Sequence, residues 1–279
     1  LHEAVWNDRV DVAKLLIEEH KMSACLSGGT VRADCGCRSS TLRWLPQDEH
    51  TPLHVAARNN AVSCITYLLT REDVKVDCVN KASKSGRCSP HRFSLGGNTP
   101  LLRACLAGHV AAVRALLDGG AVLKQCKVRF DGFLLSLTCP RRRQAGFSVL
   151  HDAVWNDRVD VVKLLIEEHK MSACLIGGTV RADCGRASST LRWLPQDERT
   201  PLHIAAWNNS VNCIKYLLTR EDVKVDFVDK VGKPVNAFAH RVSQTGDTPL
   251  LRAGKAGHVA AVRALLDGGA DLKQCKVRL

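Results

Sequence analysis

The 279-residue sequence predicts an all-α repeat protein in which short helix pairs stack side by side as a solenoid. The first observation is an internal duplication. LHEAVWNDRVDV, starting at Leu1, returns as LHDAVWNDRVDV at Leu150, and this offset is kept through roughly 100 identities in about 130 aligned positions. The second is a shorter unit that occurs three times in each copy. The third is an ordinary globular composition, 45% hydrophobic and 24% charged.

Each unit begins with a signal for the start of a helix. A Thr whose hydroxyl can accept from the first free N–H groups precedes a Pro, which the first helical position tolerates. Four units begin in this way, at Thr51, Thr99, Thr200 and Thr248. The other two begin at Ser148 and, two residues late, at Leu1. Small residues in the first helix let a neighbouring helix approach closely; examples are Ala56, Ala104 and Ala205.

A turn and a second helix follow in each unit. The turn residues are Gly108, Gly257, Asn60 and Asn209. Apolar residues at helical spacing mark the second helix, as at Ile65, Leu68 and Leu69, or at Val113, Leu116 and Leu117. Paired glycines end it, at Gly119-Gly120 and Gly268-Gly269. Because one such pair buries too little apolar surface alone, we expect the units to stack.

These residues resemble the ankyrin repeat, whose signature is TPLHxAAxxGHxxxVxxLLxxGA. The segments Thr99 to Ala121 and Thr248 to Ala270 match most of it, and Thr51 and Thr200 begin the best TPLHxAA segments. The departures are Leu102 and Leu251, where the signature has His, and Val149, where it has Pro. The resemblance covers all six units and implies an all-α, ankyrin-type helix-turn-helix solenoid.

The spacing of the units is longer than the ankyrin period of about 33 residues. The surplus lies in non-periodic stretches, at about 30–47, 82–96 and 128–144 in the first copy and at about 179–196 and 231–245 in the second. Without its stretches the first copy shortens to three units of about 33 residues each. We therefore expect two three-repeat modules, 1–149 and 150–279, that carry these stretches as insertions.

Two interpretations of the insertions remain open. In one they are long surface loops between repeats, where insertions cost little and often bind partners. In the other they are translated introns, since Lys127-Val128-Arg129 can be encoded as AAG-GTG-AGN, which resembles a splice donor. The chain also starts at Leu1 rather than Met and stops in a last unit that ends Lys-Val-Arg-Leu. We expect it to be cut from a longer array.

The sequence shows no catalytic motif. His2-Glu3 begins like an H-E-x-x-H metalloprotease helix, but Trp6 stands where the second His belongs. Neither a phosphate-binding G-x-x-x-x-G-K-[ST] nor a G-x-S-x-G elbow occurs. We expect four histidines to be structural, with the first two bonded to the Thr cap and nearby backbone: His54, His203, His109 and His258. The prediction is a protein that is not an enzyme and has no cofactor.

A zinc site is also not predicted. Cys25, Cys35 and Cys37 cluster in the first copy and are of the ligand type for structural zinc, but Arg186 replaces Cys37 in the second copy. A metal-dependent segment should keep its ligands between near-identical copies. The 13 cysteines are an odd number scattered along a long chain, which favours free thiols in a reducing compartment. We expect an intracellular protein, in the cytoplasm rather than the nucleus.

The net charge of +12 permits acidic partners without selecting one. Arg141-Arg142-Arg143 is a short basic run of the kind usually found in solvated loops. With 5 Trp, 2 Tyr and 6 Phe, the chain has few rings for stacking on single-stranded nucleic acid. No apolar stretch approaches the length of a membrane span, and no secretion signal is visible at the N-terminus.

The resemblance implies where a partner binds. In ankyrin repeats the two variable positions after the AA pair lie toward the concave face, and we call these positions the ladder. The first position holds Trp6, Arg58, Leu106, Trp155, Trp207 and Lys255. The second holds Asn7, Asn59, Ala107, Asn156, Asn208 and Ala256. Trp and Arg are enriched in interface hot spots. The alternative is that the tryptophans merely cover neighbouring helices.

These observations predict a monomeric, non-enzymatic scaffold or adaptor that binds a protein partner on the concave ladder. One alternative is that the chain is the targeting arm of a larger multidomain enzyme or channel. Another is that its basic surface binds nucleic acid or acidic lipid, in which case binding would weaken with salt.

Overall fold

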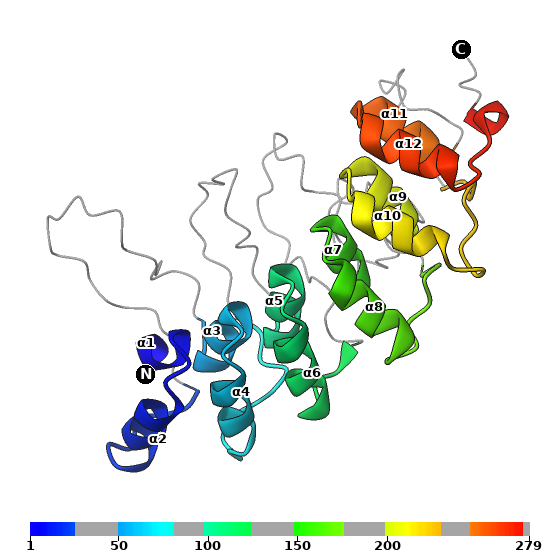
Figure 1. Cartoon of the computed structure of the whole chain (residues 1–279). Helices are drawn as coiled ribbons and strands as arrows, with labels where there is room; N and C mark the ends of the chain where they lie inside the picture. The colour runs from blue at the N-terminus through cyan, green and yellow to red at the C-terminus, as the bar shows by residue number, and fades with distance from the viewer. Residues whose placement is uncertain (26–49, 81–97, 124–147, 176–198, 230–245, 276–279) are drawn as a thin grey trace, which may run out of the picture. The chain divides into compact units, whose positions relative to one another are not determined.

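The computed structural model describes residues 1–25, 50–80, 98–123, 148–175, 199–229 and 246–275 (Figure 1). All five expected insertions lie outside these ranges. Within them the helices follow one another in pairs, so the predicted all-α fold class is confirmed. The pairs are α1 (His2–Trp6) and α2 (Val10–Glu18), α3 (Pro52–Asn59) and α4 (Val62–Leu69), α5 (Pro100–Ala107) and α6 (Val110–Asp118), α7 (Val149–Trp155) and α8 (Val159–Glu167), α9 (Pro201–Trp207) and α10 (Val211–Leu218), and α11 (Pro249–Ala256) and α12 (Val259–Asp267). A short 3-10 helix, η3 (Leu272–Cys275), follows α12.

The chain forms two compact units, Leu1–Cys139 and Pro140–Leu279. In the first unit the first helices of the pairs, α1, α3 and α5, contact one another in this order, and the second helices α2, α4 and α6 do the same. The second unit repeats the arrangement with α7, α9 and α11 in one row and α8, α10 and α12 in the other. Stacking of the helix pairs within each unit is therefore confirmed.

The predicted Thr caps are confirmed, and they take two forms. Thr99 Oγ1 accepts from the Leu102 N–H at 3.2 Å, and Thr248 does the same with Leu251. In the other form a His stands three residues after the cap, as in the pair Thr51 and His54. There Nδ1 of the ring lies 2.8 Å from the Thr hydroxyl and accepts from the Thr backbone N–H. The pairs Ser148–His151 and Thr200–His203 share this geometry.

The predicted turn residues adopt the left-handed conformation that lets the chain reverse between the helices of a pair. Asn60 and Asn209 have φ of 58°, and Gly108 and Gly257 have φ of 86° and 75°. In the first pair of each unit this conformation falls on an aspartate instead, Asp8 or Asp157, with φ of 52° and 53°.

The core of each unit lies between the stacked helices. The small residues predicted to allow close approach, Ala56, Ala104 and Ala205, are 0% exposed. Around them pack leucines and isoleucines of the second helices, including Ile65, Leu68, Leu116, Leu165, Ile214 and Leu217. Burial of each such side chain contributes about 1.5–3 kcal/mol relative to exposure, so neighbouring pairs supply most of one another's stability.

The helices of the described ranges are short, at most nine residues each. None of them is long and apolar enough to cross a bilayer.

Candidate functional site

The first ladder position falls at the same place in every described helix pair, in the last turn of its first helix. Trp6, Trp155 and Trp207 are the final residues of α1, α7 and α9, and the other three each lie one residue before the helix end. Trp207 is 37% exposed, and Arg58 and Lys255 are also exposed. Trp6, Leu106 and Trp155 are half-buried. Binding of a partner by these residues stays a prediction.

The asparagines of the second ladder position end their own helices. Each side-chain amide donates to the backbone carbonyl four residues earlier, at 2.8–3.1 Å. The four donors are Asn7, Asn59, Asn156 and Asn208. The carbonyls of Glu3, Asp152 and Ile204 also accept from the backbone N–H of the same asparagine, so the side-chain bond is a second one that fixes the backbone beside the first ladder position. Ala107 and Ala256 take the second position in α5 and α11.

Histidines of the following pair hold the ladder backbone. Nε2 of His109 donates to the carbonyl of Arg58 at 3.0 Å, and Nε2 of His258 donates to that of Trp207 at 3.0 Å. The structural roles predicted for these two histidines are thus confirmed. Ladder side chains at Arg58 and Trp207 start from a backbone that the next repeat keeps in place.

The TPLH histidines are buried and neutral. Burial lowers the pKa of His54 to about 3 and that of His203 to about 4. Nε2 donates to a backbone carbonyl of the next repeat, that of Asn98 at 2.9 Å or Asp247 at 3.0 Å, which leaves Nδ1 as the acceptor for the Thr cap. Both nitrogens therefore serve the fold, as predicted.

A Cys–His contact in the first unit is not an activated pair. Cys78 Sγ lies 3.9 Å from His54 Nδ1. Burial raises the pKa of the thiol and lowers that of the imidazole, whereas a thiolate–imidazolium pair requires the opposite shifts. Phe227 takes the place of Cys78 in the second copy. We conclude that Cys78 and His54 only pack against each other and do not form a reactive pair.

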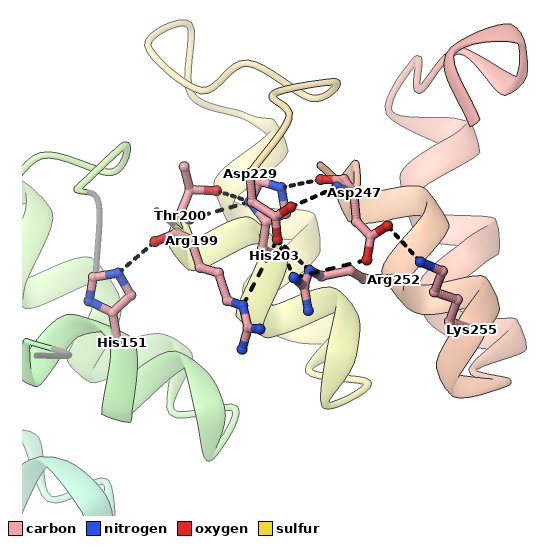
Figure 2. A network of polar contacts seen from close by, with 8 residues as sticks. All are labelled: His151, Arg199, Thr200, His203, Asp229, Asp247, Arg252 and Lys255. Carbon is pink, nitrogen blue, oxygen red and sulfur yellow. Dashed lines mark hydrogen bonds and ion pairs between the residues drawn. The ribbon is translucent and has the colours of Figure 1, made fainter. Parts of the chain in front are cut away.

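A cluster of charged residues that the sequence analysis missed lies in the second unit (Figure 2). We call Arg199, Asp229, Asp247, Arg252 and Lys255 the charged cluster. The buried Asp229 carboxylate accepts from Arg252 through Nε, at 2.8 Å, and through Nη2, and from the Asp247 N–H at 2.6 Å. Nζ of Lys255 donates to the Asp247 carboxylate at 2.6 Å. Arg199 Nε lies 3.9 Å from the Asp229 carboxylate.

The charged cluster supports a ladder residue. The guanidinium carbon of Arg252 lies 6.0 Å from the centre of the Trp207 ring, within the range of a cation–π contact. Arg252 is 5% exposed, so its charge is stabilised by Asp229 below the ring rather than by water. The Trp207 ring thus contacts a guanidinium that Asp229 holds in place.

The first unit has the same arrangement without the two aspartates and with one permanent cation, Arg103. His50, Asn80, Asn98 and Leu106 stand where the second unit has Arg199, Asp229, Asp247 and Lys255. Asn80 Oδ1 accepts from the Asn98 N–H at 2.9 Å, as Asp229 does from Asp247. Nη2 of Arg103, the counterpart of Arg252, lies 3.1 Å from His50 Nε2. The joint change of four residues between otherwise similar copies was the sequence signal for this cluster.

Aspartates between repeats were also missed. Asp8 Oδ1 accepts from the Cys64 N–H at 3.0 Å, and Asp157 accepts from Cys213 at 3.0 Å. Each carboxylate satisfies a free N–H in the first turn of the next second helix, α4 or α10. Their presence in both copies was the available signal.

In the described ranges no group of three His, Cys, Asp or Glu residues could hold a metal ion. Cys35 and Cys37 lie outside those ranges, while the Cys25 thiol donates to the Asp73 carbonyl at 2.6 Å. Cysteines with free thiols in the described ranges include Cys25, Cys64, Cys78, Cys105, Cys174 and Cys213. Burial raises the pKa of Cys64 to about 12, which keeps it protonated.

The positive charge of the chain is not carried by the described repeats. Their residues include 19 Lys and Arg and 21 Asp and Glu, against 40 and 28 in the whole sequence. Arg141-Arg142-Arg143 lies outside the described residues. The ladder therefore belongs to repeats that are nearly neutral.

Comparison with known proteins agrees with this geometry. The sequence matches the family described as ankyrin repeats (3 copies) over residues 1–126, 88–176, 122–230 and 174–275. The chain belongs to the ankyrin-repeat family, whose members are typically non-catalytic.

Two similar proteins illustrate the match. The 26S proteasome non-ATPase regulatory subunit 10 of Dictyostelium discoideum is 34% identical over 112 residues, which are 40% of this chain and 37% of that protein. The match thus spans little more than a third of that relative. The crystal structure of human ASB11 ankyrin repeat domain shares the fold, with a TM-score of 0.55 and 22% identity over 98% of this chain and 84% of that one.

Proposed function

We propose that this protein is a monomeric, non-enzymatic scaffold or adaptor that binds a protein partner on the concave ladder. Ankyrin repeats generally mediate protein–protein interaction, which supports the class of function. The similar proteasome protein is by name a regulatory subunit of a larger assembly, which also favours protein partners. It further favours a location in the cytoplasm or the nucleus, of which we propose the cytoplasm.

The single observation that carries this proposal is the exposed Trp207. Trp207 is 37% exposed, although the other hydrophobic residues of α9 are buried: Leu202, Ile204, Ala205 and Ala206. Arg252 supports the ring, and His258 holds the backbone carbonyl. A large aromatic side chain that is already ordered loses little entropy when a partner covers it.

The test is the double variant Trp155→Ala/Trp207→Ala. We expect it to weaken binding at least about tenfold, because hot-spot residues cost more than about 1 kcal/mol each when truncated. The measurement is the affinity for proteins retained by the immobilised wild-type chain. Val12→Ala is the control, since Val12 is 49% exposed and lies in α2, a second helix, whereas every first-position ladder residue lies in a first helix. Unchanged affinity with intact helicity would mean that the tryptophans only cover neighbouring helices.

A further inference from the structure

The ladder has a charge pattern that differs from the rest of the repeats. Its twelve positions include two cations, Arg58 and Lys255, and no carboxylate. Asp and Glu slightly outnumber Lys and Arg in the described residues as a whole. In each unit the first ladder position therefore holds only cationic and apolar side chains, in repeats that are nearly neutral overall.

The two ladder cations are in different electrostatic situations. Lys255 has a carboxylate of its own, because its Nζ lies 2.6 Å from Asp247. Arg58 is exposed and makes no ion pair with any residue that the structure describes. The first unit also has Asn98 where the second has Asp247, and Asn80 where it has Asp229. The aspartates that neutralise cations in the second unit are thus replaced by asparagines in the first.

The neighbours of Arg58 on the ladder are apolar. Trp6 ends α1 and Leu106 lies in α5, the two helices that pack on either side of α3. Both side chains are half-buried, so a partner that covers them also removes water from the guanidinium between them. Arg binds a carboxylate through two parallel hydrogen bonds, and desolvation strengthens such charge-assisted bonds.

We infer that the two units select different chemistry in a protein partner. The first unit takes the carboxylate of an acidic segment at Arg58, with apolar contacts to Trp6 and Leu106. The second unit takes an apolar group at Trp207, because its own carboxylates already neutralise its cations. This inference rests on the proposed function and adds the chemical class of the partner.

The experiment uses displayed random 12-residue peptides selected against the immobilised full chain. These peptides carry no phosphate, so any acids that are enriched are carboxylates. We expect enrichment of Asp and Glu beside apolar residues with the wild type and loss of that enrichment with Arg58→Trp, which installs the residue of the second copy. Lys255→Leu is the matched control, since it installs the residue of the first copy.

Affinities of the selected peptides give the quantitative test. Arg58→Trp is expected to weaken binding at least tenfold and Lys255→Leu less than threefold, and replacing the acidic residue by Gln should match the loss at Arg58. Equal losses in the two variants, or Gln peptides that bind as well as acidic ones, would overturn the inference. If the selected peptides show no acids but lose binding in Trp155→Ala/Trp207→Ala, the proposed function stands and this inference fails. If that double variant also binds unchanged, both fail.

Discussion

The two units are near-copies that differ at the junction between their second and third repeats. In the second unit the buried Asp229 binds Arg252, and Asp247 binds Lys255. In the first unit Asn80 and Asn98 make the same backbone contact without charge. The backbone geometry is kept while the charges differ, because either an amide or a carboxylate oxygen can accept from the next repeat's N–H. Charge at this junction is thus open to change without loss of the fold.

The contacts that both units share explain why the fold tolerates this change of charge. His54 and His203 bind the corresponding backbone carbonyl of the next repeat in the two copies. Asp8 and Asp157 likewise bind the corresponding backbone N–H. These contacts bind backbone groups that every repeat offers. They hold neighbouring pairs together whatever side chains occupy the ladder.

The largest difference between the units should appear on replacing Asp229 by Asn, the residue of the first copy. The variant removes the carboxylate that accepts from the buried Arg252 and leaves that arginine with the more distant Asp247, whose Oδ2 lies 4.0 Å from Arg252 Nη2, so we expect a loss of about 3 kcal/mol in the free energy of unfolding. Urea unfolding followed by circular dichroism, with amide exchange in α9 to α11, measures it. Adding Arg199→His should recover part of the loss, since it restores the His that lies beside the arginine in the first unit, where His50 Nε2 is 3.1 Å from Arg103 Nη2. A loss below about 1 kcal/mol would show that the charges are not coupled in this way.

A second difference is the response to pH at Asp152 of α7, which stands where α1 has Glu3. Asp152 is buried, and burial raises its pKa to about 7. The folded state therefore keeps a proton that the unfolded state loses above about pH 4, so this carboxyl makes the fold less stable as pH rises toward 7.

We expect Asp152→Asn to resemble the wild type near pH 4 and to be more stable at pH 8, by roughly 2–4 kcal/mol. Urea unfolding at a series of pH values gives the comparison. Glu3→Gln controls for the loss of one carboxylate, because Glu3 is exposed. A difference between Asp152→Asn and wild type that does not grow with pH would contradict the expectation.

The smallest effect concerns the shared aspartates, of which Asp157 has one partner more, since its Oδ2 also accepts from Asn212 Nδ2 at 2.9 Å. Asp8→Ala and Asp157→Ala each remove an acceptor for a helix N–H, and we expect each to cost about 1 kcal/mol. Thermal unfolding measures both, with the exposed Glu72→Ala as the control that should stay within about 0.5 kcal/mol. A cost near zero for either variant would show that its carboxylate does not stabilise the next helix.

Much of the fold could be predicted from the sequence because its signals are local. A Thr-Pro start, an Asn or Gly turn and leucines at helical spacing act within one repeat, and Thr99, Gly108 and Leu116 all have the predicted roles. For the candidate site, the sequence predicted which residues form the ladder but not the contacts that these residues make. That the asparagines donate to their own helices, and that Arg252 lies beneath Trp207, depends on contacts between atoms that no local pattern specifies.

The repeat, its helices, its caps and the family follow from residue types at fixed short spacing, so they are encoded locally. Which charges meet depends on how the helix pairs pack. Arg199, Asp229 and Arg252 are far apart along the chain and become neighbours because stacked repeats bring the ends of successive helices together. The strength of such contacts depends on burial, and burial arises only when the helix pairs pack.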